Sequence, residues 1–285
     1  MSYIIDGKAI SAQIKEECRE RVERLREKGV SVTLAVVLVG DDPASCVYVN
    51  NKKKACEFCG IESRTYELSA DTTQQEVLNL VQTLNADESV NGILVQLPLP
   101  EHIDENEIIY AISPEKDVDG FHPYNVGALS IGLPGHVSCT PAGVIELLKR
   151  SNIEISGKHC VVVGRSNIVG KPMSMLLLRE NGTVTVAHSK TADLKAVTSQ
   201  ADILVVAVGK PKFITEEYVK EGAVVIDVGI HRMDNKKLCG DVDFDRVEPK
   251  TKAITPVPGG VGVMTIAMLM HNCVTAAERK ECYER

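Results

Sequence analysis

The sequence predicts an α/β protein with two domains, built on parallel sheets with helices on both faces. Helical and strand patterns alternate along almost the whole chain, which is the order that parallel sheets require. The stretch 120–140 is rich in glycine and proline and weak in periodicity, so we expect the boundary of the first domain there. Near residue 165, a strand turns into a helix between two glycines, which adds a candidate phosphate-binding turn.

The expected strands are short apolar runs. Some are continuously hydrophobic, as is typical of strands that are covered on both faces. They span residues 32–39, 90–96, 160–164, 183–187, 203–208 and 224–228.

Three helices have clear start or stop signals. Apolar residues at helical spacing over 10–25 predict a helix that Gly29 ends. Capping residue types at 41–45 predict the start of a second helix, which Gly60 closes. A third is expected to begin at Thr140, as an N-cap followed by proline, and to run to Arg150.

Composition indicates ordinary globular domains. Of the 285 residues, 44% are hydrophobic and 25% are charged, which allows one large core or two ordinary ones. The net charge of -7 argues against an extended nucleic-acid surface. No apolar stretch approaches the roughly 20 residues of a membrane span, and the N-terminus lacks a signal-peptide layout. We therefore expect a soluble, cytoplasmic protein with no nucleic-acid or membrane partner.

The cysteines predict reduced structural thiols. There are nine, an odd number, scattered through expected helices and strands. The close pair Cys56 and Cys59 has no second pair of ligands at zinc-site spacing. The acidic residues Asp241, Asp243 and Asp245 resemble part of a calcium loop but lack its glycine and its distal glutamate. We expect no metal site.

The candidate phosphate-binding turn reads CVVVGRSNIVGKP over residues 160–172. Gly164 frees the backbone at the turn, and Gly170 allows close approach at the start of the following helix. Arg165 and Ser166 suit a phosphate carried on a ribose. The spacing departs from G-x-G-x-x-G, so a purely structural turn is the alternative.

A candidate catalytic pair lies in the second helix. Tyr48 and Lys52 are four residues apart and share a helical face. A lysine held against a tyrosine and away from water can have its pKa lowered until it serves as a base or proton shuttle. The alternative is a solvated basic stripe, because Lys53 and Lys54 follow directly.

Three further segments carry candidate ligand groups. Gln96 stands at the C-terminal end of an expected strand, where open α/β sheets bind ligands. Asp117 and Asp119 lie in a turn-rich loop, where carboxylates are usually caps or turn formers. The loop 256–262 is bare and rich in glycine and proline, which suits the approach of a flat ligand.

Six segments, in order, resemble the bifunctional methylenetetrahydrofolate dehydrogenase/cyclohydrolase family, also called the FolD family. They read YVNNKKKA, VQLPLP, KDVDGFHP, CTPAG, VVVGRSNIVGKP and TPVPGGVG, and they span nearly the whole chain. The resemblance implies two α/β domains, the second a doubly wound parallel sheet of Rossmann type, with the active-site cleft between them. It implies a folate-binding catalytic domain over 1–120, joined by the C-terminal helix 264–285, and an NADP-binding domain over 140–263.

The resemblance also implies an activity in one-carbon metabolism. NADP oxidises 5,10-methylenetetrahydrofolate to the methenyl form, which is then hydrolysed to 10-formyltetrahydrofolate. The family's catalytic lysine maps to Lys52, its ring-packing tyrosine to Tyr48, the glutamine that tunes the lysine to Gln96 and the pterin-binding aspartate to Asp119. A homodimer is implied as well.

The resemblance extends to both ligand sites. The expected folate contacts are Tyr48, Lys52, Gln96, Leu97, Pro98, Asp119, Pro258, Gly259 and Gly260. The GRS turn, together with Ser189 after His188, favours NADP over NAD. The expected cofactor contacts are Thr140, Gly164, Arg165, Ser166, Val169, Gly170, His188, Ser189, Val208, Gly209, Gly229 and Ile230.

Two departures from the family pattern are visible. Val263 stands where GGVGPMT has proline, which bears on the shape of that loop, and Ser138 stands where proline is common, a change we expect to be neutral. Among other classes, short-chain dehydrogenases share the Tyr-x-x-x-Lys spacing, but their glycine turn precedes it, whereas Gly164 comes more than a hundred residues after Tyr48. A folate- or nucleotide-binding protein without turnover is expected to lack Lys52. A dehydrogenase without cyclohydrolase activity is the nearest rival.

Overall fold

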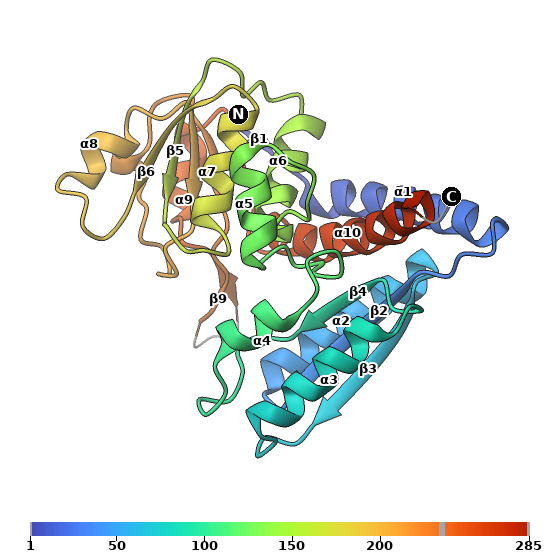
Figure 1. Cartoon of the computed structure of the whole chain (residues 1–285). Coiled ribbons are helices and arrows are strands. Elements are labelled where there is room, and N and C mark those ends of the chain that lie inside the picture. Colours follow the sequence, from blue (N-terminus) through green and yellow to red (C-terminus); the bar gives the residue numbers. More distant parts are fainter. Residues whose placement is uncertain (1, 234–236, 284–285) are drawn as a thin grey trace. The chain divides into compact units, whose positions relative to one another are not determined.

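The computed structural model describes residues 2–233 and 237–283, which form two compact units, each with its own parallel sheet (Figure 1). We name the units after their sheets. The three-stranded unit comprises Ala12–Val137 and Ile266–Arg285, and the six-stranded unit comprises Met1–Ser11 and Ser138–Thr265.

Two of the three boundaries between the units fall inside long helices, α1 (Gly7–Glu27) and α10 (Val261–Tyr283), and the third lies between Val137 and Ser138. The first eleven residues belong to the six-stranded unit, because strand β1 (Tyr3–Ile4) pairs with its sheet. The sequence had suggested instead that residues 1–120 go together. The C-terminal part of α10 belongs to the three-stranded unit.

The three-stranded sheet is parallel, with β2 (Thr33–Val39) between β3 (Glu62–Leu68) and β4 (Gly92–Val95). All seven residues of β2 are buried, because helices α2 (Pro43–Cys59) and α3 (Gln74–Ala86) cover its two faces (Figure 1). The alternating strand residues Ala35, Val37 and Val39 pack in one core with Val77 and Val81 of α3.

Two short helices, α4 (Glu105–Ala111) and α5 (Pro123–Ile131), and the rest of α10 complete this unit. Asn272 on α10 donates hydrogen bonds of 2.9 Å to the carbonyls of Val118 and Val137, which ties the helix to the unit. By length and composition alone, Val261–Cys282 could cross a membrane, although the sequence analysis had found no such stretch. Since 61% of the apolar window is buried, we interpret α10 as a core helix.

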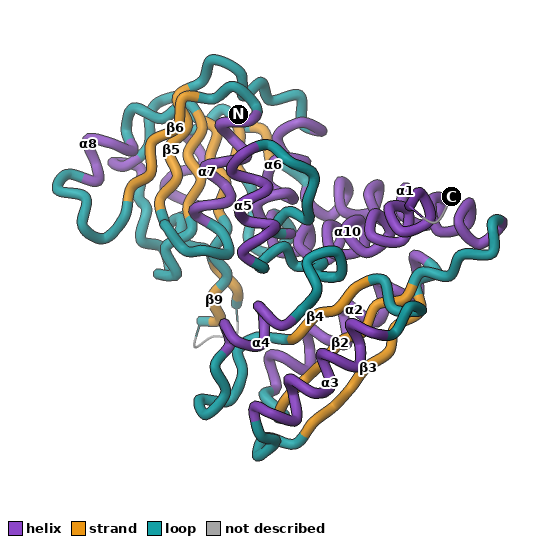
Figure 2. Tube along the Cα trace, viewed as in Figure 1, coloured by secondary structure: helices purple, strands orange, loops and turns teal. Residues whose placement is uncertain are grey.

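The six-stranded sheet is parallel throughout. Its order is β1, β11 (Ala253–Ile254), β8 (Val224–Asp227), β7 (Ile203–Val206), β5 (His159–Val163) and β6 (Thr183–Ala187). Strands β5 and β6 lie side by side at one end of the sheet (Figure 2), and the chain then returns to β7 on the other side of β5. This reversal is the switch point at which doubly wound sheets bind their ligands, outside the C-terminal ends of the strands.

The connections of the six-stranded unit are mostly short helices. They are α6 (Cys139–Arg150), α7 (Gly170–Arg179), α8 (Leu194–Thr198), α9 (Phe244–Val247) and two 3₁₀ turns (Glu216–Tyr218 and Glu248–Lys250). A separate antiparallel pair, β9 (His231–Arg232) and β10 (Leu238–Cys239), follows β8.

Several helix ends agree with the sequence. Helix α2 starts after Asp42, whose side chain accepts a hydrogen bond from the Ser45 amide (2.8 Å), and it stops at Gly60, which has a left-handed φ of 75°. Helix α1 ends near Gly29, as predicted.

The predicted N-cap at Thr140 is wrong. Helix α6 already begins at Cys139, and Ser138 is the residue at the N-cap position. Thr140 lies within the first turn, where its hydroxyl pairs with the Thr265 hydroxyl at 2.9 Å. The threonine-proline signal marked the right helix, two residues too late.

Several elements were not expected from the sequence, among them α5 and β3. Helix α5 lies inside the glycine-rich stretch 120–140, where His122 caps it by accepting a hydrogen bond from the Tyr124 amide. Strand β3, ESRTYEL, is half-exposed at the edge of its sheet and therefore lacks an apolar pattern.

Candidate active site

Lys52 contacts Gln96 across the three-stranded unit. Lys52 Nζ on α2 donates a hydrogen bond of 2.8 Å to Gln96 Oε1. Lys52 is half-buried, whereas Lys53 and Lys54 point outward and are exposed. The three consecutive lysines therefore do not form one solvated stripe, and Lys52 differs from its neighbours in having a specific partner.

Gln96 is fixed by its place directly after β4. Its amide donates to the carbonyl of Val37 in the neighbouring strand (2.8 Å). Its side-chain Nε2 donates to the carbonyl of Leu97 (2.6 Å), which orients the side-chain oxygen toward Lys52. The Gln96 side chain donates to Leu97 and accepts from Lys52, so its oxygen holds the lysine amine at a defined point.

Two aspartates in the loop before α5 have different environments. Asp117 is buried and accepts hydrogen bonds from the amides of Gly120 (3.1 Å) and His122 (2.8 Å) and from the Asn125 side chain (2.9 Å). Asp117 is thus the turn former that the sequence suggested. Among the residues the structure describes, none donates a hydrogen bond to the carboxylate of Asp119.

Burial raises the pKa of the Asp119 carboxyl to about 6. The nearby Lys52 ammonium lowers that pKa, and the Asp117 carboxylate raises it. Asp119 is therefore a partly buried acceptor, and no described protein group donates to it. Such a group gains when a ligand supplies donors to it.

The remaining folate candidates of this unit lie on the same elements. Tyr48 is one turn before Lys52 on α2 and is 42% exposed, so its ring is accessible. Leu97 and Pro98 directly follow Gln96 and are joined by a cis peptide bond. Pro98 is exposed, and Leu97 is half-buried.

In the six-stranded unit, the predicted turn joins β5 to α7 at the switch point. Gly164 has a φ of 133°, and a Cβ there would lie 2.3 Å from the carbonyl oxygen of Ala207 in the loop after β7. A Cβ on Gly170 would lie 2.3 Å from the carbonyl oxygen of Gly164 itself. Both glycines are needed because the backbone of this turn is packed against other backbone.

The polar side chains of this turn are available to a ligand. Arg165 and Ser166 are exposed, and among the described residues Arg165 has no hydrogen-bond partner. Ser166 Oγ accepts long hydrogen bonds from the amides of Val169 (3.2 Å) and Gly170 (3.3 Å), which leaves its proton free to donate. This arrangement can receive a phosphate.

The other candidate cofactor residues follow the neighbouring strands. His188 and Ser189 come after β6, where the His188 amide donates to Thr191 Oγ1 at 2.9 Å and Ser189 is exposed. Val208 and Gly209 follow β7, and the pair Gly229–Ile230 follows β8. These segments leave the C-terminal ends of parallel strands, as does the Gly164 turn.

The loop before α10 is packed without side chains. A Cβ on Gly260 would lie 2.5 Å from the carbonyl oxygen of Pro256, and a Cβ on Gly7 would lie 2.2 Å from that of Gly260. Gly259 is buried with a φ of 102°, whereas Pro258, in a cis peptide bond, is exposed. The glycines predicted for this loop allow its backbone to pack directly against the start of α1.

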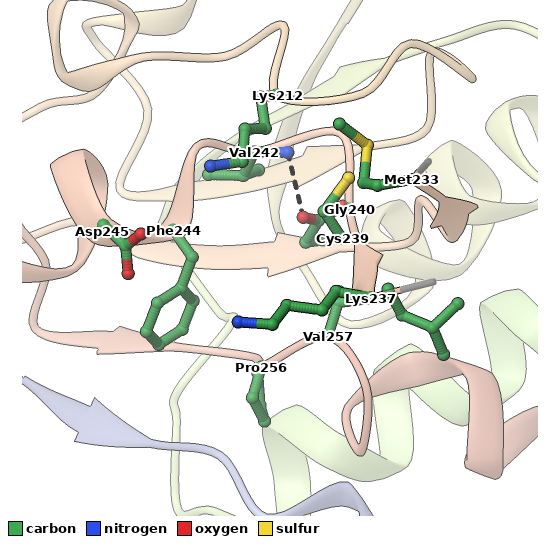
Figure 3. Close-up of a pocket in the computed structure, with 12 residues that line it drawn as sticks. Lys212, Met233, Lys237, Cys239, Gly240, Val242, Phe244, Asp245, Pro256 and Val257 are labelled. Carbon is green, nitrogen blue, oxygen red and sulfur yellow. Dashed lines mark hydrogen bonds between the residues drawn. The ribbon is translucent and has the colours of Figure 1, made fainter. Parts of the chain in front are cut away.

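A separate cavity of about 370 Å³ lies elsewhere in the six-stranded unit (Figure 3). Strand β10, Lys212, Phe244 and Pro256 contribute to its walls, and the amide of Lys212 donates to the carbonyl of Gly240 at 2.9 Å. None of the predicted folate or cofactor residues lines it.

The cysteines are consistent with structural thiols. All nine are free, and burial raises the pKa of Cys56 and of Cys59 to about 12, which keeps both protonated. Within the described ranges 2–233 and 237–283, no group of three or more His, Cys, Asp or Glu residues is arranged to hold a metal ion.

Two family models together match most of the chain. The model described as the tetrahydrofolate dehydrogenase/cyclohydrolase catalytic domain matches residues 5–119, and the model of the NAD(P)-binding domain of the same family matches residues 138–281. The chain belongs to the tetrahydrofolate dehydrogenase/cyclohydrolase family. Lys52, Gln96 and Asp119 fall within the first match, and the Gly164 turn falls within the second.

Relatives and solved structures of the tetrahydrofolate dehydrogenase/cyclohydrolase family match over the full length. The bifunctional protein FolD of Lachnoclostridium phytofermentans is 67% identical, over 98% of this chain and 99% of that protein. The crystal structure of the FolD enzyme from Campylobacter jejuni has a TM-score of 0.97 and 53% identity, covering 98% of this chain and 100% of that one. The Trypanosoma brucei FolD structure, a complex with NADP cofactor and an inhibitor, has a TM-score of 0.93 and 41% identity, covering 98% of each chain.

The departures from the family pattern have specific surroundings. Ser138 Oγ donates a hydrogen bond of 2.6 Å to the carbonyl of Ile168 in the Gly164–Gly170 turn, which a proline could not do. The substitution expected to be neutral therefore adds a contact to that turn. Val263 lies in the first turn of α10, where its carbonyl accepts from Ser11 Oγ at 3.1 Å.

The sequence interpretation missed the role of two buried aspartates. Asp241 was weighed only as a metal ligand and rejected as one, and Asp227 lay within the expected strand 224–228 without a role of its own. Both accept several backbone hydrogen bonds in the loops after β7 and β8. The available signal was the pairing of each aspartate with an adjacent or nearby glycine, which leaves room for a carboxylate against the main chain.

Proposed function

We propose that this enzyme oxidises 5,10-methylenetetrahydrofolate with NADP⁺ to 5,10-methenyltetrahydrofolate and hydrolyses that product to 10-formyltetrahydrofolate. Membership of the dehydrogenase/cyclohydrolase family, through both of its domains, supports the two activities. The observation that carries the proposal is the 2.8 Å contact of Lys52 with Gln96, near an Asp119 carboxyl that has no protein donor. Residues 12–119 thus hold the folate, and the turn from Gly164 to Gly170 holds NADP.

Asp119 binds the pterin. The pterin ring presents an edge of N–H donors, and a carboxylate can accept two of them at once. The Asp119 side chain is already partly buried, so part of its hydration is lost before the ligand binds. The exposed Tyr48 ring supplies a flat apolar surface for the pterin, near the Lys52 amine.

Lys52 carries the hydrolytic step. The methenyl carbon is electron-poor, so water adds to it and loses one proton, which leaves a hydroxyl on that carbon. The bond to one folate nitrogen then breaks as that nitrogen is protonated, and the hydroxyl releases its proton to solvent as it becomes the formyl carbonyl. An amine held by Gln96 can take the first proton and supply the second. Gln96 is itself neutral, so it positions the Lys52 amine while the amine can still gain or lose a proton.

NADP supplies the hydride acceptor of the oxidation when it is bound. The exposed Arg165 guanidinium and the Ser166 hydroxyl fit the phosphate on its ribose. The protein's part in this step is to align the folate carbon with the nicotinamide and to exclude water. Lys52 has less to do in hydride transfer than in hydrolysis.

The test is a two-signal assay. Protein is mixed with methylenetetrahydrofolate and either NADP or NAD, and methenyl absorbance and reduced cofactor are followed together. Reduced cofactor with only transient methenyl product supports both activities. Stoichiometric methenyl product that decays only at the uncatalysed rate would mean a dehydrogenase without cyclohydrolase activity.

We further propose that the enzyme acts as a homodimer in the cytoplasm, with no nucleic-acid or membrane partner. The acidic net charge of -7 and the burial of the apolar window of α10 support the absence of nucleic-acid and membrane partners, and the homodimer is what the family resemblance implies. Sedimentation equilibrium across a range of protein concentrations tests the oligomeric state directly.

A further inference from the structure

The carboxylate of Asp241 fills an anion-binding nest in the six-stranded unit. Asp241 is fully buried, and Oδ2 accepts from the amides of Val208 (2.6 Å) and Gly209 (3.0 Å). Oδ1 accepts from the amide of Lys210 (2.9 Å) and lies 2.7 Å from His231 Nε2. Three consecutive amides that converge on one anion form the arrangement that binds phosphate in other proteins. Here the protein's own carboxylate occupies it.

This one carboxylate joins two loops. Val208 follows β7 and His231 follows β8, and these strands are parallel neighbours in the sheet. The loops therefore leave the same edge of the sheet, which is the edge where doubly wound folds bind their ligands. They contain Val208, Gly209, Gly229 and Ile230, the residues expected to contact the cofactor.

A second carboxylate, that of Asp227, binds the backbone next to Asp241. Its carboxylate accepts hydrogen bonds of 2.9 Å from the amides of Gly229, Asp241 and Val242. Burial raises the pKa of Asp227 to about 6, while these amides lower it.

Two glycines make room for the carboxylates. A Cβ on Gly240 would lie 1.8 Å from Asp227 Oδ2, and a Cβ on Gly229 would lie 2.5 Å from Asp241 Cγ. The two carboxylates thus pack directly on the main chain, and among the described residues no other side chain accepts a hydrogen bond from those amides. Because the carboxylates fit closely against Gly229 and Gly240, this is a specific pair of aspartates and not a general acidic cluster.

We propose that Asp241 is a positioning residue for the nicotinamide cofactor. It fixes the loops after β7 and β8 in one shape, and it occupies the amides of residues 208–210 so that the cofactor's phosphates bind only at the Gly164–Gly170 turn. This inference rests on the proposed function, because it takes these loops to be walls of the NADP site.

The first test is Asp241→Asn, which keeps the size of the side chain but turns an amide NH₂ toward backbone donors. We expect the Kd and the KM for NADP to rise about tenfold or more, the scale of one lost charged hydrogen bond. The KM for methylenetetrahydrofolate and the hydrolysis of supplied methenyltetrahydrofolate stay near wild type. Asp245→Asn is the matched control, because Asp245 is an exposed aspartate four residues away and the amides of residues 208–210 donate to Asp241 instead.

Chemical rescue separates positioning from general destabilisation. Asp241→Ala empties the nest, so added formate should restore part of the NADP affinity in that variant and have no effect on the wild type. If the Asp241 variants do not fold, the Kd for NADP is measured for His231→Ala instead, because this substitution removes only the contact between Asp241 and the loop after β8. It is expected to raise the Kd for NADP about threefold or more at an unchanged melting temperature.

Two results are distinguishable failures. A folded Asp241→Asn or His231→Ala protein with the wild-type Kd for NADP would overturn the positioning role alone. A wild-type protein that binds no NADP and oxidises no methylenetetrahydrofolate would overturn the proposed function, and the positioning role with it.

Discussion

Lys52 and Gln96 are joined by a 2.8 Å hydrogen bond although they are 44 residues apart in the chain. Lys52 lies on α2, and Gln96 follows β4, so the contact exists only because that helix covers this sheet. Lys53, one residue further along the same helix, points about 100° away and is exposed. Substituting each lysine in turn therefore distinguishes a catalytic role of Lys52 from the mere loss of one positive charge.

Lys52→Met should lower cyclohydrolase activity by about a hundredfold or more, the usual scale for a lost general acid or base. Lys53→Met should leave it near wild type, because that ammonium is solvated. The measurement is hydrolysis of supplied methenyltetrahydrofolate by both folded variants. Dehydrogenase activity is expected to fall less in Lys52→Met. A wild-type rate of hydrolysis in Lys52→Met would refute the role of this lysine.

Asp119→Asn should weaken folate binding and lower both activities while leaving NADP affinity nearly unchanged, since an amide offers only one acceptor to the pterin edge. Wild-type folate affinity should itself fall as the pH drops through about 6, because the carboxyl becomes protonated there. Titrations of each ligand between acidic and neutral pH test both statements. Normal folate binding with lost NADP binding would place Asp119 in the other site.

The same substitution should stabilise the ligand-free protein at neutral pH. The pKa of Asp119 is raised in the folded state from 3.8 to about 6, so the folded protein holds a proton that the unfolded chain releases. Wild-type stability from this group is present below the unfolded pKa and is lost as the pH rises through 6. Asparagine has no carboxyl to ionise, so the free energy of unfolding of Asp119→Asn should exceed that of the wild type by up to about 2 kcal/mol at neutral pH. Denaturant unfolding should show no gain near pH 4.

Arg165→Ala should reduce the preference for NADP over NAD. We expect the wild type to use NADP at least about tenfold more efficiently, because a guanidinium without a protein partner is available to the 2′-phosphate. The variant should lose kcat/KM with NADP and keep it with NAD. Equal use of both cofactors by the wild type, or an NAD preference that survives the substitution, would contradict this assignment.

Gly170→Ala should destabilise the protein by about 3 kcal/mol, because the added Cβ would lie 2.3 Å from a backbone carbonyl oxygen that cannot move away. Gly127→Ala is the matched control in helix α5. Nothing lies within 4 Å of its Cβ position, so alanine should raise stability by about 0.5–1 kcal/mol. Urea unfolding midpoints compare the two, and equal effects would mean that the turn relaxes around the new methyl group.

The sequence was informative wherever a local pattern decides the outcome. The buried strands of both sheets read as apolar runs, and Gly60 ended α2 because a left-handed residue there is a local requirement. The glycines of the 164–170 turn were identified because a strand-to-helix turn needs them within a few residues. Strand β3 escaped detection, since a half-exposed edge strand has no continuous apolar run.

Residue chemistry by itself determined the α/β class, the position of the phosphate-binding turn and a short set of candidate groups that included Lys52, Gln96 and Asp119. Only the tertiary structure showed which candidates have partners. It gave Lys52 its contact with Gln96, left Asp119 partly buried and without a donor among the described residues, and made Asp241, where the sequence predicted no metal site, the anion of a backbone nest. The reason is physical: hydrogen-bond partners and solvation depend on which distant segments meet at a sheet edge, whereas capping and periodicity depend on neighbours a few residues away.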